Sequence, residues 1–126
     1  MHLRTNLAKA KGLGSSKSGY HHWLMQRMTA VILVIVAFWL IYFLAGISQK
    51  SAIEVLSELK KPYNLTFFSI FILTSIYHGN LGLQVVIEDY VHNLCIRNTL
   101  LIMVKLFSLI TAFSFIIAVF HLISIR

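Results

Sequence analysis

Charge is scarce in this chain, and acidic charge is scarcer still. The 126 residues include 11 lysines and arginines but only 4 aspartates and glutamates, and charged residues make up 12% of the sequence. That fraction is about half the value for a typical soluble domain. The single cysteine, Cys95, excludes an intrachain disulfide and is interpreted as an idle thiol in a loop. Hydrophobic residues make up 58% of the chain, which points away from a soluble domain.

Three long stretches contain no charged residue at all. They lie between Arg27 and Lys50 (22 residues), between Lys61 and Glu88 (26 residues) and between Lys105 and Arg126 (20 residues). Crossing a hydrocarbon core takes roughly 20 helical residues. A soluble helical bundle would need a polar stripe on each helix, whereas residues 30–44 (AVILVIVAFWLIYFL) are apolar all round. The sequence therefore predicts an all-α integral membrane protein with three transmembrane helices.

The predicted spans occupy about residues 28–48, 64–89 and 100–125, which leaves no room for a soluble catalytic domain. Residues 1–27 form a basic segment without an acid. A signal peptide is disfavoured because the first apolar run is too long and lacks a small-x-small cleavage site, and a mitochondrial transit sequence stays open. The positive-inside rule places the N-terminus on the inner side. We expect a multi-pass protein of the bacterial inner membrane, with the mitochondrial inner membrane as the alternative.

The segment between the first two spans has its own pattern. Residues 48–61 carry apolar side chains at weak helical spacing, which predicts a short amphipathic helix on the outer surface. Pro62 is tolerated at a helix start. We expect Asn64 to be the N-cap of the second span.

His78 lies near the middle of the second uncharged run. An ionisable side chain at membrane depth is costly and usually has a partner, and histidine is the commonest metal ligand. His78, Gly82, Val85 and Asp89 follow at i, i+4, i+7 and i+11, so they share one helix face. Gly79 and Gly82 allow a helix or a flat ring to approach the backbone. This pattern fits helix packing, with His78 hydrogen-bonding across it, as well as it fits metal ligation.

Asp89 and Tyr90 end the second run, about 18 Å along the helix axis from His78. A tyrosine at a membrane edge is typical of the aromatic belt. A phenol backed by a carboxylate can also donate to a carbonyl oxygen of a membrane-soluble substrate and help deliver protons. Arg27 is explained by positive-inside anchoring, or as a charged fork for a carboxylate such as a haem propionate. His21 could assist there or be solvated.

In their order and spacing these residues resemble a known family. The features are Gly19, the segment Arg27-Met28-Thr29-Ala30 before the first of three spans, and His78 followed eleven and twelve residues later by Asp89-Tyr90. Over nearly its whole length the chain resembles the hydrophobic membrane anchor subunit of succinate dehydrogenase, respiratory complex II. The similarity is to alphaproteobacterial forms of the smaller of the two cytochrome b anchors.

The resemblance implies a role for each of these residues. His78 would be one axial ligand of the iron of haem b, with the partner histidine on the second cytochrome b anchor subunit. Tyr90 would hydrogen-bond a ubiquinone carbonyl with Asp89 supporting that site, and Arg27 would face a haem propionate with His21 in the same neighbourhood. The chain would anchor the flavoprotein and iron–sulfur subunits while electrons from succinate reduce ubiquinone. It would oxidise no succinate itself, and we expect no catalytic residue in it.

Two other functions fit the residues. One is a non-catalytic membrane assembly or transport-accessory protein, in which His78 is a polar packing residue and the basic N-terminus binds anionic lipid. The other is a homodimeric b-type cytochrome that uses His78 of each chain. His121 lies near the outer end of the third span, so we do not expect both axial ligands from one chain. The expected partners are membrane lipids and protein subunits, not nucleic acid.

Overall fold

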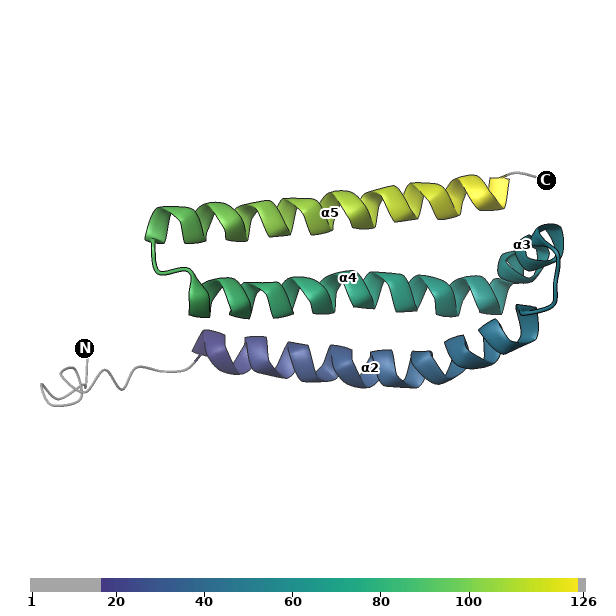
Figure 1. Cartoon of the computed structure of the whole chain (residues 1–126), viewed down its shortest axis with the longest axis horizontal. Helices are drawn as coiled ribbons and strands as arrows, with labels where there is room; N and C mark the ends of the chain where they lie inside the picture. Colours follow the sequence, from purple (N-terminus) through teal and green to yellow (C-terminus); the bar gives the residue numbers. More distant parts are fainter. Residues whose placement is uncertain (1–16, 125–126) are drawn as a thin grey trace, which may run out of the picture.

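The computed structural model describes residues 17–124, so residues 1–16 of the predicted basic segment lie outside the described residues. Within this part of the chain, every regular element is a helix. The helices are α2 (Lys17–Ile47), α3 (Ala52–Lys60), α4 (Pro62–Tyr90) and α5 (Leu94–Ser124). The long helices α2, α4 and α5 run antiparallel to their neighbours, and α4 lies between the other two (Figure 1).

The three long helices have the length and composition of membrane spans. The shortest of them, α4, has 29 residues, which corresponds to about 43 Å of helix against a hydrocarbon core of about 30 Å. The buried hydrophobic core is small and consists of Val36, Leu65 and Leu81. Large apolar side chains point outward instead, and both Phe38 and Phe107 are 72% exposed. This distribution suits a lipid solvent, and the predicted all-α fold with three apolar spans is confirmed.

Helix α2 begins well before its apolar run. Residues 17–27, which the sequence assigns to a surface segment, form its first three turns. Aromatic stacking joins α2 to α4 near the other end of the bundle. The ring of Trp39 stacks on Phe43 and on Phe67 of α4, with 5.3 Å between the ring centroids in each pair.

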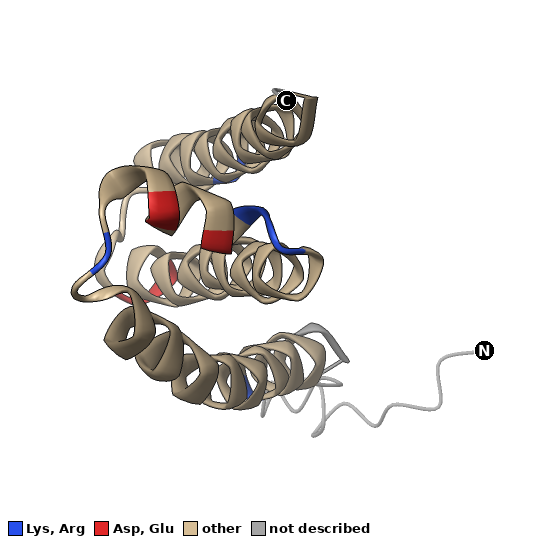
Figure 2. Cartoon of the chain, turned by 90° about the vertical axis from the view of Figure 1, so that its right-hand side faces the viewer, with Lys and Arg blue, Asp and Glu red and all other residues tan. Residues whose placement is uncertain are grey.

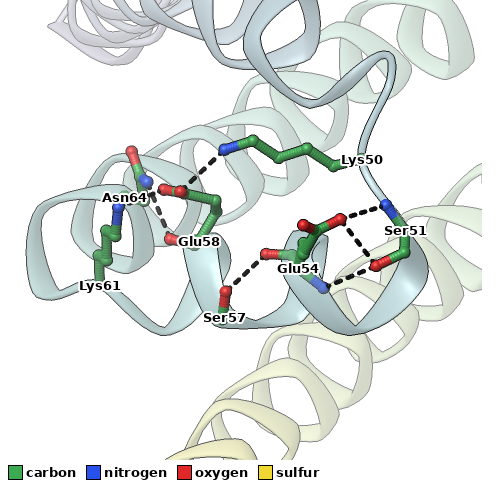
Figure 3. Close-up of polar contacts among 7 residues, drawn as sticks. All are labelled: Lys50, Ser51, Glu54, Ser57, Glu58, Lys61 and Asn64. Carbon is green, nitrogen blue, oxygen red and sulfur yellow. Dashed lines mark hydrogen bonds and ion pairs between the residues drawn. The ribbon is translucent and has the colours of Figure 1, made fainter.

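The short helix α3 begins with a capping box (Figure 3). The Ser51 hydroxyl accepts a hydrogen bond from the Glu54 N–H at 3.5 Å, and the Glu54 carboxylate accepts from the Ser51 N–H at 2.8 Å. Hydrogen bonds from the Ser51 backbone and hydroxyl lower the pKa of Glu54. The predicted short helix is confirmed, and its place on the outer surface stays a prediction.

Glu58 ties α3 to the segments on both sides of it. Its carboxylate lies 2.8 Å from the Lys50 ammonium and 2.7 Å from that of Lys61, and these contacts lower the pKa of Glu58. A lowered carboxyl pKa means that the carboxylate stabilises the fold at neutral pH and that this contribution is lost as the pH falls through the lowered pKa. Figure 2 shows the acidic residues of α3 together at this end of the bundle.

The prediction that Asn64 caps the second span is wrong. Helix α4 begins at Pro62, and its N-cap is Lys61, which makes no side-chain capping bond. Proline at the first helical position lacks the N–H that would need a cap, and its fixed φ starts the helix two residues early. Asn64 is 3% exposed, and its amide donates to the Glu58 carbonyl at 2.8 Å, near the C-terminus of α3.

Candidate functional site

His78 on α4 makes a polar contact with α2 across the helix interface. Its Nδ1 lies 2.9 Å from the Thr29 Oγ1. Thr29 is 8% exposed, and its Oγ1 also lies 2.9 Å from the Met25 carbonyl and 3.0 Å from that of Gln26. Two proton arrangements satisfy this geometry. Either the hydroxyl donates to a carbonyl and accepts from Nδ1–H, or it donates to Nδ1 and the proton of His78 is on Nε2.

The second ring nitrogen of His78 is available. Nε2 makes no hydrogen bond with any residue of the described range 17–124. His78 lies sixteen residues after Pro62 and twelve before Tyr90, or roughly 24 Å and 18 Å along α4, which places it near mid-depth. No group of three or more histidine, cysteine and acidic side chains among the described residues could hold a metal. A metal at His78 would therefore need its other ligands from outside the described residues.

The two glycines beside His78 have different surroundings. A Cβ atom placed on Gly82 would lie 3.8 Å from Gln26 Nε2, an ordinary contact, so Gly82 faces α2 as His78 does. A Cβ on Gly79 would meet no described atom within 4 Å. The sequence predicts that another helix approaches the glycine backbone. Of these two glycines, only Gly82 has such a neighbour in the described structure, and the contact is at ordinary van der Waals distance. The backbone at Gly79 is open to a neighbour outside the described chain.

A groove that the sequence does not reveal lies between α2 and α4, on the side of His78 toward the end of the bundle that carries Tyr90. It encloses about 500 Å³ between α2 and α4. It is lined by Gly19, His22, Trp23, Gln26, Gln84, Val85 and Glu88. Within it, the Gln84 amide donates to the Glu88 carboxylate at 2.8 Å. His22, Gln26 and Thr29 follow at i, i+4 and i+7, so the helical spacing that revealed the face of α4 could have revealed this face of α2.

Asp89 and Tyr90 lie at the open end of α4. Both are exposed, Tyr90 by 77%, and neither is bonded to another side chain of the described range. The start of α2 and the end of α4 are at the same end of the bundle (Figure 1). His21 is exposed on α2 near this end. The structure leaves these side chains facing outward, where a neighbouring molecule can reach them.

Arg27 is at this end of the bundle but lies deeper than Asp89. It is two residues from Thr29, so its Cα is only about 3 Å from the level of His78, whereas Asp89 is about 16 Å away along the axis. Its guanidinium lies 6.0 Å from the ring centroid of Trp23, one turn closer to the helix start. Arg27 and Thr29 are about 200° apart around α2, so Arg27 does not share the face that contacts His78.

Antiparallel apolar helices of membrane-spanning length, joined at mid-depth through a histidine, define an α-helical membrane protein with several spans. The family model of the succinate dehydrogenase/fumarate reductase transmembrane subunit matches residues 1–118. The chain belongs to this family, and the resemblance inferred from the sequence is confirmed.

Named relatives agree with this membership. The chain is 51% identical over 119 residues to the succinate dehydrogenase hydrophobic membrane anchor subunit of Rickettsia bellii, across 94% of this chain and 95% of the relative. It is 46% identical to that of Rickettsia prowazekii over the same shares. The succinate dehydrogenase membrane anchor subunit of Reclinomonas americana is 38% identical over 80 residues, which is 61% of this chain and 67% of the relative. No solved structure matches the chain.

Proposed function

We propose that this chain is a membrane anchor subunit of succinate dehydrogenase that binds haem b through His78 and contributes to the ubiquinone-reduction site. The names of the relatives support the anchor role. The observation that carries the haem assignment is the 2.9 Å contact between His78 Nδ1 and Thr29 Oγ1.

His78 fits an axial haem ligand. A metal-bound histidine usually donates its other ring N–H to an acceptor, which fixes the tautomer and orients the ring. Thr29 is such an acceptor when its hydroxyl proton goes to the carbonyl of Met25 or Gln26. The lone pair of Nε2 is then free to bind iron. A haem supplies the porphyrin nitrogens itself and needs only axial ligands from protein, so the lack of a side-chain cluster among the described residues is compatible with it.

The second axial ligand comes from another chain in this proposal. His121 lies three residues from the end of α5, which is beside the start of α4 (Figure 1). It is therefore on the order of 20 Å from the level of His78. We assign the second ligand to a histidine of the other cytochrome b anchor subunit. A bound haem b would supply one-electron transfer at this depth.

Arg27 serves a haem propionate in this proposal. Its guanidinium is exposed and unpaired with any carboxylate of the described residues, and it points toward the end of the bundle, over Trp23. A guanidinium offers a planar fork that matches a carboxylate. His21, six residues closer to the helix start and also exposed, belongs to the same neighbourhood.

The exposed end of α4 serves ubiquinone. The Tyr90 hydroxyl donates to a quinone carbonyl oxygen, and the Asp89 carboxylate beside it holds protons that arrive from the inner aqueous side. The flavoprotein and iron–sulfur subunits sit on that face, and the remaining residues of the quinone site belong to the iron–sulfur subunit and the second anchor. This arrangement places the N-terminus inside, in a bacterial inner membrane or its mitochondrial counterpart.

The haem assignment is tested in the complex expressed with its neighbouring subunits. His78→Ala should abolish or sharply reduce the haem b absorbance per complex, and residual haem should show the altered spectrum of a replaced axial ligand. His92→Ala, at an exposed histidine just beyond α4, should leave the spectrum unchanged. A wild-type chain that purifies without haem and without dehydrogenase subunits contradicts the proposal. A haem-bearing dimer of this chain alone would favour the homodimeric cytochrome instead.

The quinone assignment is tested separately with Tyr90→Phe, which removes one hydroxyl. Quinone reduction should fall about 5- to 10-fold, the effect of losing one hydrogen bond. Succinate oxidation with a soluble dye as acceptor, and the haem content, should not change. Tyr63→Phe at the opposite end of α4 is the matched control. Full quinone reduction in the Tyr90 variant would remove the quinone role and leave the haem assignment standing.

A further inference from the structure

Lys105 is a charged residue in the membrane-spanning part of α5. No acidic side chain of the described residues pairs with it, because Glu54 and Glu58 belong to α3, Glu88 binds Gln84, and Asp89 is unpaired at the end of α4. It lies eleven residues, or about 16 Å, from the start of α5. The 31-residue helix is about 46 Å long, so when centred on a 30 Å core it places the Lys105 Cα about 8 Å inside the hydrocarbon. A charge at that depth is costly and usually functional.

Lys105 lines a cleft between α4 and α5 of about 480 Å³. Because the two helices are antiparallel, the polar lining lies toward the end of the bundle that carries Tyr90. The polar side chains in this part are Tyr77, Asn80, Gln84 and Lys105, with Ser108 beside them, and Leu81 lines it as well. The apolar part continues toward the other end and consists of Leu73, Ile76, Leu109 and Ala112. The cleft is therefore amphipathic along its length.

Three polar groups of the cleft lack a partner. The Tyr77 hydroxyl, the Asn80 amide and the Lys105 ammonium make no hydrogen bond with any residue between 17 and 124. The Gln84 amide and the Ser108 hydroxyl are already used, since they donate to Glu88 and to the Val104 carbonyl. Unpartnered polar groups in an apolar medium cost free energy. A ligand with negatively charged oxygens at one end and hydrocarbon at the other would remove this cost.

The dimensions of the cleft indicate what can fill it. It extends from Leu73 to Gln84, which is about 16 Å along α4. This length accommodates a stretch of an acyl chain that lies parallel to the two helices.

We propose that the cleft between α4 and α5 binds one anionic phospholipid, with its headgroup phosphate on Lys105 and an acyl chain along Ile76, Leu109 and Ala112. A lysine side chain on a helix leans toward the helix N-terminus, which for Lys105 is the direction of the nearer membrane surface. The phosphate meets the ammonium there, and Asn80 and Tyr77 are placed to donate to headgroup or ester oxygens. This site requires only that the three helices span a bilayer, and it is independent of haem and quinone binding.

The test measures lipid binding to the intact detergent-purified complex by native mass spectrometry. After delipidation, the complex is titrated with palmitoyl-oleoyl phosphatidylglycerol or with phosphatidylcholine of the same chains. The wild type should retain one phosphatidylglycerol in preference to phosphatidylcholine. Lys105→Gln should weaken phosphatidylglycerol binding about fivefold, the effect of one lysine near an anionic headgroup. Lys60→Gln removes the same charge at the other end of the bundle and should change nothing.

A second variant tests the apolar part of the cleft. Ala112→Trp fills its deep end and should weaken binding of both lipids, while the subunit composition and thermal stability of the complex stay at the wild-type level. Equal retention of the two lipids by the wild type, or unchanged phosphatidylglycerol binding in Lys105→Gln, overturns the proposal. Loss of a partner subunit from Lys105→Gln would also overturn it, because the ammonium would then be paired with a protein carboxylate.

Discussion

The hydroxyl of Thr29 joins α2 to α4 at the level of His78, through its contact with Nδ1 of that histidine. Replacing it with the isosteric valine, in Thr29→Val, keeps the packing but leaves Nδ1–H without an acceptor. Loss of such a supporting hydrogen bond typically costs about 10- to 100-fold in metal affinity. We expect a lower haem content per complex and a shifted haem midpoint potential.

Thr29→Ser is the matched control, because serine keeps the oxygen that contacts His78 Nδ1. It should retain wild-type haem content and potential. If the valine variant binds haem with unchanged potential and absorbance, Thr29 has no role in orienting the His78 ring. That result would not contradict the assignment of His78 as a haem ligand.

Residue chemistry was partly predictable from the sequence. The cost of an ionisable group in an apolar run singles out His78, and the helical spacing relates it to Gly82 on one face. Its partner Thr29 is 49 residues away in the sequence. Nothing in the sequence determines the register of α2 against α4, so this contact could not be predicted. The level of Arg27 relative to His78 depends on that same register.

At the scale of single elements, α3 depends on its N-terminal capping box more than on burial, since none of its residues is buried. Ser51→Ala removes the hydroxyl that accepts from the Glu54 N–H. An N-cap change of this kind costs about 1 kcal/mol of helix stability. Hydrogen exchange of the amides of residues 52–60 in the purified complex should therefore accelerate roughly fivefold.

Ser57→Ala supplies the control within the same helix. The Ser57 hydroxyl donates to the Glu54 carbonyl at 2.7 Å and caps no free N–H (Figure 3). Alanine has the higher helix propensity, so exchange should not accelerate in this variant. Equal acceleration in both variants would show that the capping box does not hold α3 together.

The sequence pattern predicted the positions of the long helices better than their first residues. Charge-free runs predicted where three helices lie, because a helix in lipid must be apolar on every side. They did not predict where the helices begin. Helix α2 continues eleven residues before its predicted span, and α4 begins at Pro62 rather than after Asn64, since a helix can continue past the membrane wherever its backbone remains hydrogen-bonded.

At the scale of the whole molecule, the chain has too small a core to be stable in water. Its buried hydrophobic residues in the described range are three, and the outward faces of α2, α4 and α5 are apolar. Lipid and partner subunits must cover those faces. Composition alone predicted this membrane class, but which surface faces lipid and which faces a partner depends on chains that the sequence does not contain.

The orientation of the whole molecule follows from its basic N-terminal end and can be tested with its single cysteine. Cys95 is exposed at the start of α5, at the same end as the beginning of α2 and Tyr90. With the N-terminus inside, a membrane-impermeant maleimide should label Cys95 in inside-out vesicles and leave it unlabelled in right-side-out vesicles. Labelling is measured as the mass added to this chain, with Cys95→Ser as the blank.

A second position covers the case in which dehydrogenase subunits shield Cys95. Gln49→Cys in the Cys95→Ser background places a thiol on the exposed segment between α2 and α3, at the opposite end of the bundle. It should react only in right-side-out vesicles. The reverse labelling pattern at Gln49→Cys would show that the molecule has the opposite orientation in the membrane. Asp89 and Tyr90 would then lie on the outer side, away from the proton supply that the proposed quinone site requires.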